Sequence, residues 1–142
     1  MTIEIRILGA GDAAVLLNVA PDVFDNPVDP RQAAAFLQDG HHHLVVALDG
    51  DLVVGFASGV TYLHPDKPME LWINEVGVAA SHRRQGIGKQ VVQALCQLGR
   101  AAGCREAWVL TDRANDAAMR LYEAAGGAAP DEVLLYSFAL EM

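Results

Sequence analysis

The sequence predicts an α/β (α+β) fold, in which helices pack against one sheet of mixed strand direction. Short runs of alternating polar and branched residues are typical of half-buried strands. An Asp-Gly pair at positions 49 and 50 separates two apolar runs and is typical of a tight hairpin. A further apolar run at 69–79 is followed by a helical pattern and another apolar run, which is the order of a parallel crossover. The sheet should therefore contain both antiparallel and parallel pairs.

The N-terminal part predicts one strand and two helices. Isoleucines at every second position of 3–7 indicate a strand that ends at the glycine following it. Residues 13–19 have a helical pattern, and 21–30 should form a loop. A second helix is expected over 30–38, because a proline stands at its first position and a glycine follows its end.

The middle of the chain predicts the hairpin and the longest helix. Strands are expected at 44–48 and 52–61, on either side of the Asp-Gly turn, and a fourth strand at 69–79. Apolar residues then recur at spacings of four and three on one face of a helix. These residues are Ile87, Val91, Leu95, Leu98 and Ala102.

The C-terminal part predicts a strand at 107–111, a helix at 115–125 and a last strand at 133–140. A pair of glycines closes the helix, as is common at helix C-termini. The length of 142 residues fits one compact domain, and 52% hydrophobic residues can fill its core. We therefore expect residues 1–142 to form a single domain.

The composition excludes several classes of function. Ten basic and eighteen acidic residues give a net charge of −8, which disfavours nucleic acid as a partner and suits a cationic one. Apolar runs are far shorter than the roughly 20 residues that cross a bilayer, and the first residues do not resemble a signal peptide. We expect a cytoplasmic protein without membrane contact, and two reduced cysteines.

A glycine-bearing segment between the fourth strand and the long helix supplies what a diphosphate needs. Gly86 and Gly88 permit close backbone approach, and the first helical turn offers free amides and positive potential. Arg83, Arg84 and Lys89 add formal charge. The glycine spacing matches neither a dinucleotide-binding fingerprint nor a nucleoside triphosphate loop.

This segment resembles the coenzyme A motif of the Gcn5-related N-acetyltransferases (GNAT), which is Arg or Gln, two residues, Gly, one residue, then Gly or Ala. Residues 83–88 match it in full, and 121–127 with Asn115 resemble the second motif of the family. The resemblance covers residues 69 to the C-terminus. It implies a GNAT fold with a largely antiparallel sheet of six to seven strands, about four flanking helices, and a splay between strands four and five.

The same resemblance implies that acetyl-coenzyme A is the co-substrate and that its pantetheine lies between the splayed strands, with no metal required. It implies that the donor is held by residues of strand four, the loop and the next helices. These residues are Val76, Gly77, Val78, Arg83, Arg84, Gln85, Gly86, Ile87, Gly88, Lys89 and Asn115.

Two residues are candidates for proton transfer. An amine must lose a proton to attack a thioester, and strand alternation places Glu75 on the face of Leu71 and Ile73, as a base among apolar neighbours. The alternative is a structural carboxylate. The resemblance makes Tyr122 the acid for the departing thiolate, although this tyrosine also lies on the apolar stripe of its helix, where it can serve as plain core.

Further likeness, in 82–87, in Tyr62-Leu63 and in the tail 136–138, is to the aminoglycoside 3-N-acetyltransferase branch. It implies acetylation of a small polycationic amine, an antibiotic-resistance activity. Neither cysteine is near the donor motif, which favours direct attack in a ternary complex over a covalent intermediate. Candidate acceptor-binding carboxylates stand in loops or at a helix start; they are Asp25, Asp29, Asp112 and Asp116. The alternatives are acetylation of a protein N-terminus, lysine, polyamine or metabolite amine, and a coenzyme A-binding module without turnover.

Three other features are assigned structural roles. Residues 41–43 are consecutive histidines, but adjacent side chains of an extended segment point in opposite directions and cannot meet one metal ion. Trp72 and Trp108 are expected in the core rather than as substrate platforms. The apolar run 133–140 could pair, as an edge strand, with a second subunit and form a homodimer.

Overall fold

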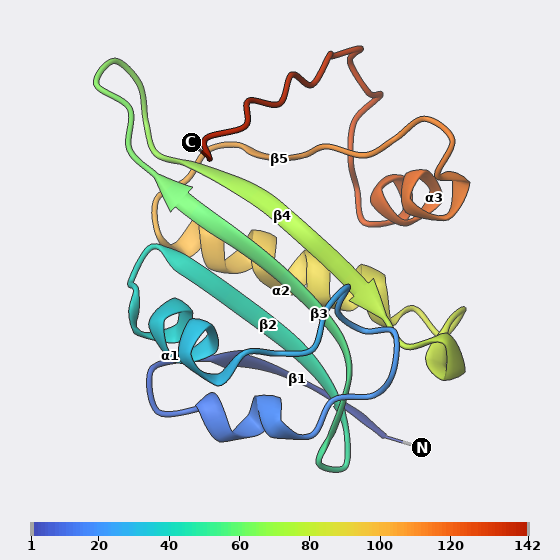
Figure 1. Ribbon diagram of the computed structural model, residues 1–142. Coiled ribbons are helices and arrows are strands. Elements are labelled where there is room, and N and C mark those ends of the chain that lie inside the picture. The colour runs from blue at the N-terminus through green and yellow to red at the C-terminus, as the bar shows by residue number, and fades with distance from the viewer. Residues whose placement is uncertain (1, 142) are drawn as a thin grey trace.

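A computed structural model describes residues 2–141, and its centre is one five-stranded sheet in the order β1-β2-β3-β4-β5 (Figure 1). The strands are β1 (Ile3–Leu8), β2 (His42–Asp49), β3 (Leu52–Tyr62), β4 (Glu70–Val78) and β5 (Ala107–Val109). Pairs β1/β2, β2/β3 and β3/β4 are antiparallel, whereas β4/β5 is parallel. The mixed, largely antiparallel sheet is confirmed.

Helices cover both faces of the sheet. They are α1 (Pro30–Gln38), α2 (Ile87–Ala101) and α3 (Asp116–Ala124), with short 3-10 helices η1 (Ala13–Leu17) and η2 (Ala80–His82). Figure 1 shows α2 behind the sheet and α1 in front of it. Cβ atoms added to Gly55 or Gly59 of β3 would meet side chains of α2. The other face of β3, together with α1, borders the cavity described below.

The core lies between the central strands and these helices. β2 and β3 are buried on both faces, which explains why their sequences are nearly continuous apolar runs. The apolar stripe expected in the long helix is confirmed at Ile87, Val91 and Leu95, which are almost fully buried. Side chains this deeply buried each contribute about 1.5 to 3 kcal/mol to folding.

The helix expected at 13–19 is shorter and tighter than predicted. η1 is a 3-10 helix that ends at Leu17. The backbone then leaves the helical path because Val53 N donates to Asn18 O at 2.9 Å and Ala20 N donates to Val53 O at 2.9 Å. Bonding to β3 therefore stops the helix, and no local pattern could have indicated it.

The last strand expected at 133–140 is wrong for this structure. The segment carries no strand pairing, and the exposed fractions of its large apolar side chains range from 64% at Val133 to 90% at Leu140. Within residues 2–141 the sheet thus has five strands rather than six to seven, and three α-helices rather than about four accompany it.

A β-bulge in β4 changes the face of Glu75. Ile73 is opposite Gly59 and Glu75 is opposite Ser58, so Asn74 is an extra residue. Neighbours on β3 point to opposite faces, and a bulge reverses the alternation beyond it. Glu75 therefore shares the open face with Ser58 and is exposed, whereas Leu71 and Ile73 are buried. The expectation that Glu75 lies among these apolar neighbours is wrong.

The pairing of β4 with β5 covers only Leu71–Ile73. Beyond Ile73, β4 continues for five residues while β5 ends. The two parallel strands thus part at this level, in agreement with the splay expected between strands four and five. Among the residues that the structure describes, no helix is long and apolar enough to cross a membrane.

Candidate active site

The loop between β4 and α2 presents free backbone amides. Arg84 and Gly86 both have positive φ, at 64° and 77°, and α2 begins directly after Gly86 without a capping side chain. The amides of the first helical turn have no intrahelical partner, and the helix dipole adds positive potential there. Alternation of left-handed and right-handed backbone also turns successive N–H groups into a concavity that suits anions. This geometry fits a diphosphate.

The two glycines of the loop serve different purposes. Gly86 has open space around its Cβ position and is needed for its backbone conformation. Gly88 is buried, and a Cβ atom there would lie 2.9 Å from Leu121 Cδ1. Its missing side chain thus allows α3 to pack on the first turn of α2. Ile87 is also buried, so only its backbone can face a ligand.

The free edge of β4 carries the second set of amides. Ala79 N donates to Val54 O at 2.8 Å, toward β3. Because N–H direction alternates along a strand, the amides of Val76 and Val78 point away from β3, to the side where β5 has diverged, and that of Gly77 points toward β3. Arg83 Nε donates to Val78 O at 3.4 Å, which places its guanidinium beside this edge.

A histidine holds the loop against the sheet. His82 Nε2 donates to Asp49 Oδ2 at 2.9 Å, and His82 Nδ1 lies 2.7 Å from Ser81 Oγ. The His82 side chain is 12% exposed. His82 therefore joins η2 to the turn between β2 and β3.

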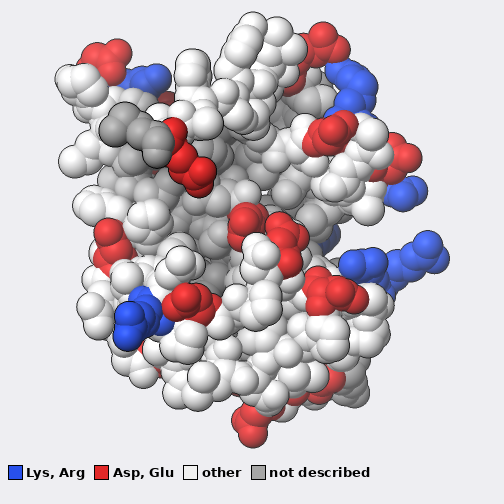
Figure 2. All heavy atoms as spheres, in the orientation of Figure 1, with Lys and Arg blue, Asp and Glu red and all other residues white. Residues whose placement is uncertain are grey.

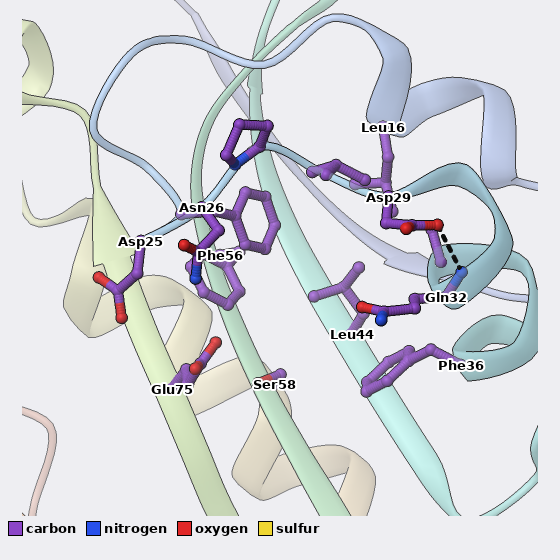
Figure 3. Close-up of a pocket in the computed structure, with 14 residues that line it drawn as sticks. Leu16, Asp25, Asn26, Asp29, Gln32, Phe36, Leu44, Phe56, Ser58 and Glu75 are labelled. Atoms are coloured by element: carbon purple, nitrogen blue, oxygen red, sulfur yellow. Dashed lines mark hydrogen bonds between the residues drawn. The ribbon is translucent and has the colours of Figure 1, made fainter.

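A cavity of about 260 Å³ opens on the other face of the sheet, between β3, β4, α1 and the loop after η1 (Figure 3). Phe24 and Phe56 form one wall and stack with ring centroids 4.0 Å apart. The carboxylates of Glu75 and Asp25 lie on the β4 side, near Ser58. Apolar walls with a few convergent polar groups are typical of small-molecule sites.

The structure brings together only some of the predicted acceptor residues. Asp25, Asp29 and Glu75 line the same cavity. Asp29 also caps α1, because its Oδ1 accepts from the amides of Arg31 and Gln32. Asp112 and Asp116 lie apart from this cavity, where Asp112 bonds the Ala114 amide and Asp116 occupies the first turn of α3.

Sequence reasoning missed several lining residues, among them Phe24, Asn26, Gln32, Phe36 and Ser58. Ser58 could have been found from the hairpin pairing, had the bulge at Asn74 been recognised. The others come from a loop and from α1, where no motif marks them.

Tyr122 and Asn115 belong to the neighbouring helix α3. Burial raises the pKa of the Tyr122 phenol above its usual value near 10.0, so the group keeps its proton at neutral pH. Asn115 Oδ1 accepts from Ala118 N at 3.0 Å as the cap of α3, which leaves its amide nitrogen available. Gln85 and Lys89 are exposed in the loop and first turn.

Charge is unevenly distributed on the face that carries the cavity. Figure 2 shows acidic side chains near the centre of this face and basic side chains projecting from its margin. Among the described residues, no group of three or more His, Cys, Asp or Glu side chains could hold a metal ion. The open face thus attracts cations, whereas the loop before α2 suits an anion.

The uncapped N-terminus of α2 lies beside the parting strands β4 and β5, an arrangement that agrees with the fold implied by residues 83–88. Residues 15–127 match the model of the acetyltransferase (GNAT) family, and the chain belongs to that family. The family resemblance expected from residues 83–88 is confirmed.

One relative by sequence and two solved structures extend the comparison. The chain is 36% identical over 101 residues to the N-alpha-acetyltransferase RimI of Mycobacterium tuberculosis, a match that covers 69% of this chain and 61% of that protein. An aminoglycoside acetyltransferase from an uncultured soil metagenomic sample, solved with sisomicin, superimposes with a TM-score of 0.82 at 22% identity, covering 98% and 97% of the two chains. Aminoglycoside N-acetyltransferase AAC(6')-Iy, solved with a bisubstrate analogue, gives 0.80 at 20% identity, covering 98% and 99%. These structures share the fold.

Proposed function

We propose that the protein is an acetyl-coenzyme A-dependent N-acetyltransferase whose acceptor is a small polycationic amine of the aminoglycoside type. The observation that carries the proposal is the bulge at Asn74. It turns Glu75 into the acidic cavity, while the next residues of β4 present their amides to the gap beside β5. The candidate proton acceptor and the edge that would bind acetyl-coenzyme A thus adjoin on one strand.

The donor fits the residues present. The uncapped first turn of α2, together with Arg83, Arg84 and Lys89, would hold the pyrophosphate, and Val76 and Val78 would bind the pantetheine amides like an added strand. Acetyl-coenzyme A supplies an activated thioester when it is bound. Asn115 would contribute its free amide nitrogen to the pantetheine arm.

The chain's own residues move two protons. Glu75, directly or through one water, takes a proton from the ammonium of the acceptor, so that the amine nitrogen forms a bond to the acetyl carbon as the carbon–sulfur bond breaks. Tyr122 gives its proton to the departing sulfur, and the proton that the new amide nitrogen must still lose passes through water to the Tyr122 phenolate. The two cysteines are unsuited to a covalent route, because burial raises the pKa of both thiols. Direct transfer in a ternary complex follows.

Charge supports an aminated sugar as the acceptor. Asp25, Asp29 and Glu75 converge on one cavity in a protein of net charge −8. The volume of about 260 Å³ accepts one ring, and further rings would extend over the open sheet. Because they lie outside the cavity, Asp112 and Asp116 would contact only such distal parts.

Thiol release from acetyl-coenzyme A tests this proposal across aminoglycosides, polyamines, amino acids and N-terminal peptides. We expect turnover with aminoglycosides, and a fall in kcat of about a hundredfold in Glu75→Gln with unchanged acetyl-coenzyme A affinity. Glu123→Gln, which changes an exposed carboxylate of α3, is the matched control. Full activity of Glu75→Gln at saturating substrates would remove the base assignment.

Product analysis addresses the position of acetylation. The likeness of residues 82–87 favours the 3-amino group, whereas one solved neighbour carries a 6' designation in its name. Mass spectrometric fragmentation of acetylated sisomicin distinguishes the two nitrogens. A product acetylated at 6' would retain the acceptor class and overturn the 3-N branch.

A second candidate is acetylation of a protein N-terminus. It is favoured by the 36% identity to RimI, an N-alpha-acetyltransferase. Turnover with N-terminal peptides and none with aminoglycosides would establish this candidate in place of the first. Coenzyme A binding with no turnover across the panel would instead indicate a regulatory module.

A further inference from the structure

The two tryptophans form a stacked pair on the sheet. Trp72 of β4 and Trp108 of β5 are in register, with ring centroids 4.9 Å apart and an interplanar angle of 14°. The expectation that both are core residues is wrong, because Trp72 is 38% exposed and Trp108 is only partly buried, outside the core cluster. Because tryptophan is one of the more thoroughly buried residues on average, an ordered, exposed indole suggests a contact that folding itself does not supply.

A chain of hydrogen bonds fixes the orientation of the pair. Trp108 Nε1 donates to Tyr62 Oη at 3.2 Å, and Tyr62 Oη donates to Glu70 Oε1 at 3.2 Å. The Glu70 side chain is itself only 16% exposed and lies 3.4 Å from His64 Nε2. The polar atom of Trp108 is thus satisfied within the protein, and Trp72 rests on a ring that is held before any ligand arrives.

The pair shares the face of the candidate base. Trp72 is opposite Val60 and Glu75 is opposite Ser58. Val60 and Ser58 are two residues apart on β3, so all four side chains point to the open face. Because Asn74 is bulged, Trp72 and Glu75 are separated by only two residues of the paired strand β3, a distance of about 7 Å at about 3.3 Å per residue.

The chemistry of this surface selects a cationic ring. An indole face attracts ammonium groups and the C–H face of a sugar ring. The carboxylates of Glu75 and Asp25 lie toward the cavity, and that of Glu70 is linked to Trp108 through Tyr62. A separation of about 7 Å is longer than one sugar ring and matches neighbouring rings of one molecule.

We propose that Trp72, supported by Trp108, is a specificity-determining platform for a second aminosugar ring of the acceptor, while an amine of the first ring reacts at Glu75. This inference rests on the proposed function, because it assigns a site to the distal part of the same substrate. Trp72 and Trp108 are positioning residues and take no part in proton transfer.

Intrinsic fluorescence tests the contact directly, since the chain contains only these two tryptophans. We expect sisomicin to change the emission of the wild-type protein in the absence of acetyl-coenzyme A. The change should persist in Trp108→Phe, where Trp72 is the sole fluorophore, and be lost for the most part in Trp72→Phe. Glucosamine, a single ring, should change the emission much less than sisomicin does.

Steady-state kinetics give the second measurement. Trp72→Ala should raise the KM for sisomicin about tenfold more than it raises the KM for acetyl-coenzyme A. The kcat should change less than twofold. Trp72→Phe should lie between the wild type and Trp72→Ala. Leu63→Ala, which truncates an exposed side chain outside the pair, is the matched control and should leave the sisomicin KM within twofold.

The outcomes separate this inference from the proposed function. Turnover of sisomicin with the same KM in Trp72→Ala would overturn the platform and leave the aminoglycoside acetyltransferase intact. Turnover of N-terminal peptides alone, with emission unaffected by sisomicin, would overturn both. Thermal unfolding of each variant identifies any loss of activity that comes from misfolding. If Trp72→Ala misfolds, the KM of Trp72→Phe for sisomicin decides whether the platform exists.

Discussion

Gly88 at the start of α2 lies directly against Leu121 of α3, so close that a Cβ atom would stand 2.9 Å from Leu121 Cδ1. This contact joins the helix whose N-terminus faces the candidate donor site to the helix that carries Tyr122. Residues 83–88 and 121–127, which resemble the two motifs of the family, are therefore in contact. A substitution in one segment should alter the position of the other.

Gly88→Ala should destabilise the protein by about 1 to 3 kcal/mol, because overpacking forces neighbouring side chains or backbone to move. The KM for acetyl-coenzyme A should rise as the first turn of α2 shifts. Chemical denaturation and thiol-release kinetics measure the two effects. Adding Leu121→Ala should recover part of the loss in a double-mutant cycle, and strictly additive effects would contradict the packing role.

Gly86→Ala should act through backbone conformation alone, since its Cβ would meet no atom within 4 Å. A left-handed φ costs a residue with a side chain about 1 to 2 kcal/mol. Gly86→Asn should cost less, because asparagine tolerates this conformation better. If alanine and asparagine have equal effects on the free energy of unfolding and on acetyl-coenzyme A affinity, the strain explanation fails.

Asp49→Asn should loosen the loop before α2, because it weakens the hydrogen bond that the His82 side chain donates. Loss of a hydrogen bond to a charged, part-buried group should cost about 1 to 3 kcal/mol. Isothermal titration should show weaker acetyl-coenzyme A binding, because His82 links Asp49 to the loop before α2. Asp51→Asn, in the same turn, is the control and should bind like the wild type.

Tyr122→Phe should alter how stability depends on pH. Burial raises the pKa of this phenol in the folded state, so stability is fully present below the unfolded value near 10.0 and falls as pH rises through the folded value. The free energy of unfolding should therefore fall less steeply above about pH 10 in the variant than in the wild type. Parallel declines in denaturation series at increasing pH would contradict this reading.

The same variant tests the acid assignment. Without a proton to give to the sulfur, Tyr122→Phe should lose kcat by about a hundredfold while acetyl-coenzyme A still binds. Tyr136→Phe, which changes an exposed tyrosine of the C-terminal segment, is the control. Normal kcat in Tyr122→Phe would leave the residue with a core role only.

The C-terminal segment carries a prediction about assembly. Consecutive apolar residues from Val133 to Leu140 suit a strand covered on both faces, yet they are exposed in the monomer. We expect a homodimer in which this segment is covered, detectable by sedimentation equilibrium. Replacing Leu134 and Phe138 by serine should shift the equilibrium to monomer, and a wild-type monomer at all concentrations would contradict the prediction.

Local chemistry by itself determined several elements of this protein. The Asp-Gly turn, the proline and glycine at the ends of α1, and the apolar stripe of α2 were each predicted from neighbours in the chain. Residues 83–88 also predicted the loop before α2, whose positive φ angles and uncapped first helical turn depend on neighbours within a few residues. Such features need no distant partner.

Only the tertiary structure decided which face Glu75 takes, which acidic residues meet, and where Trp72 lies. The face depends on one unpaired residue, Asn74, whose position is set by pairing with β3 and leaves no mark in the alternation. Asp25 joins Glu75 although fifty positions separate them, because the loop after η1 packs over β4. Trp72 is exposed because its face of the sheet is left open at this position. The sequence pattern does not indicate which face of a sheet stays open to solvent.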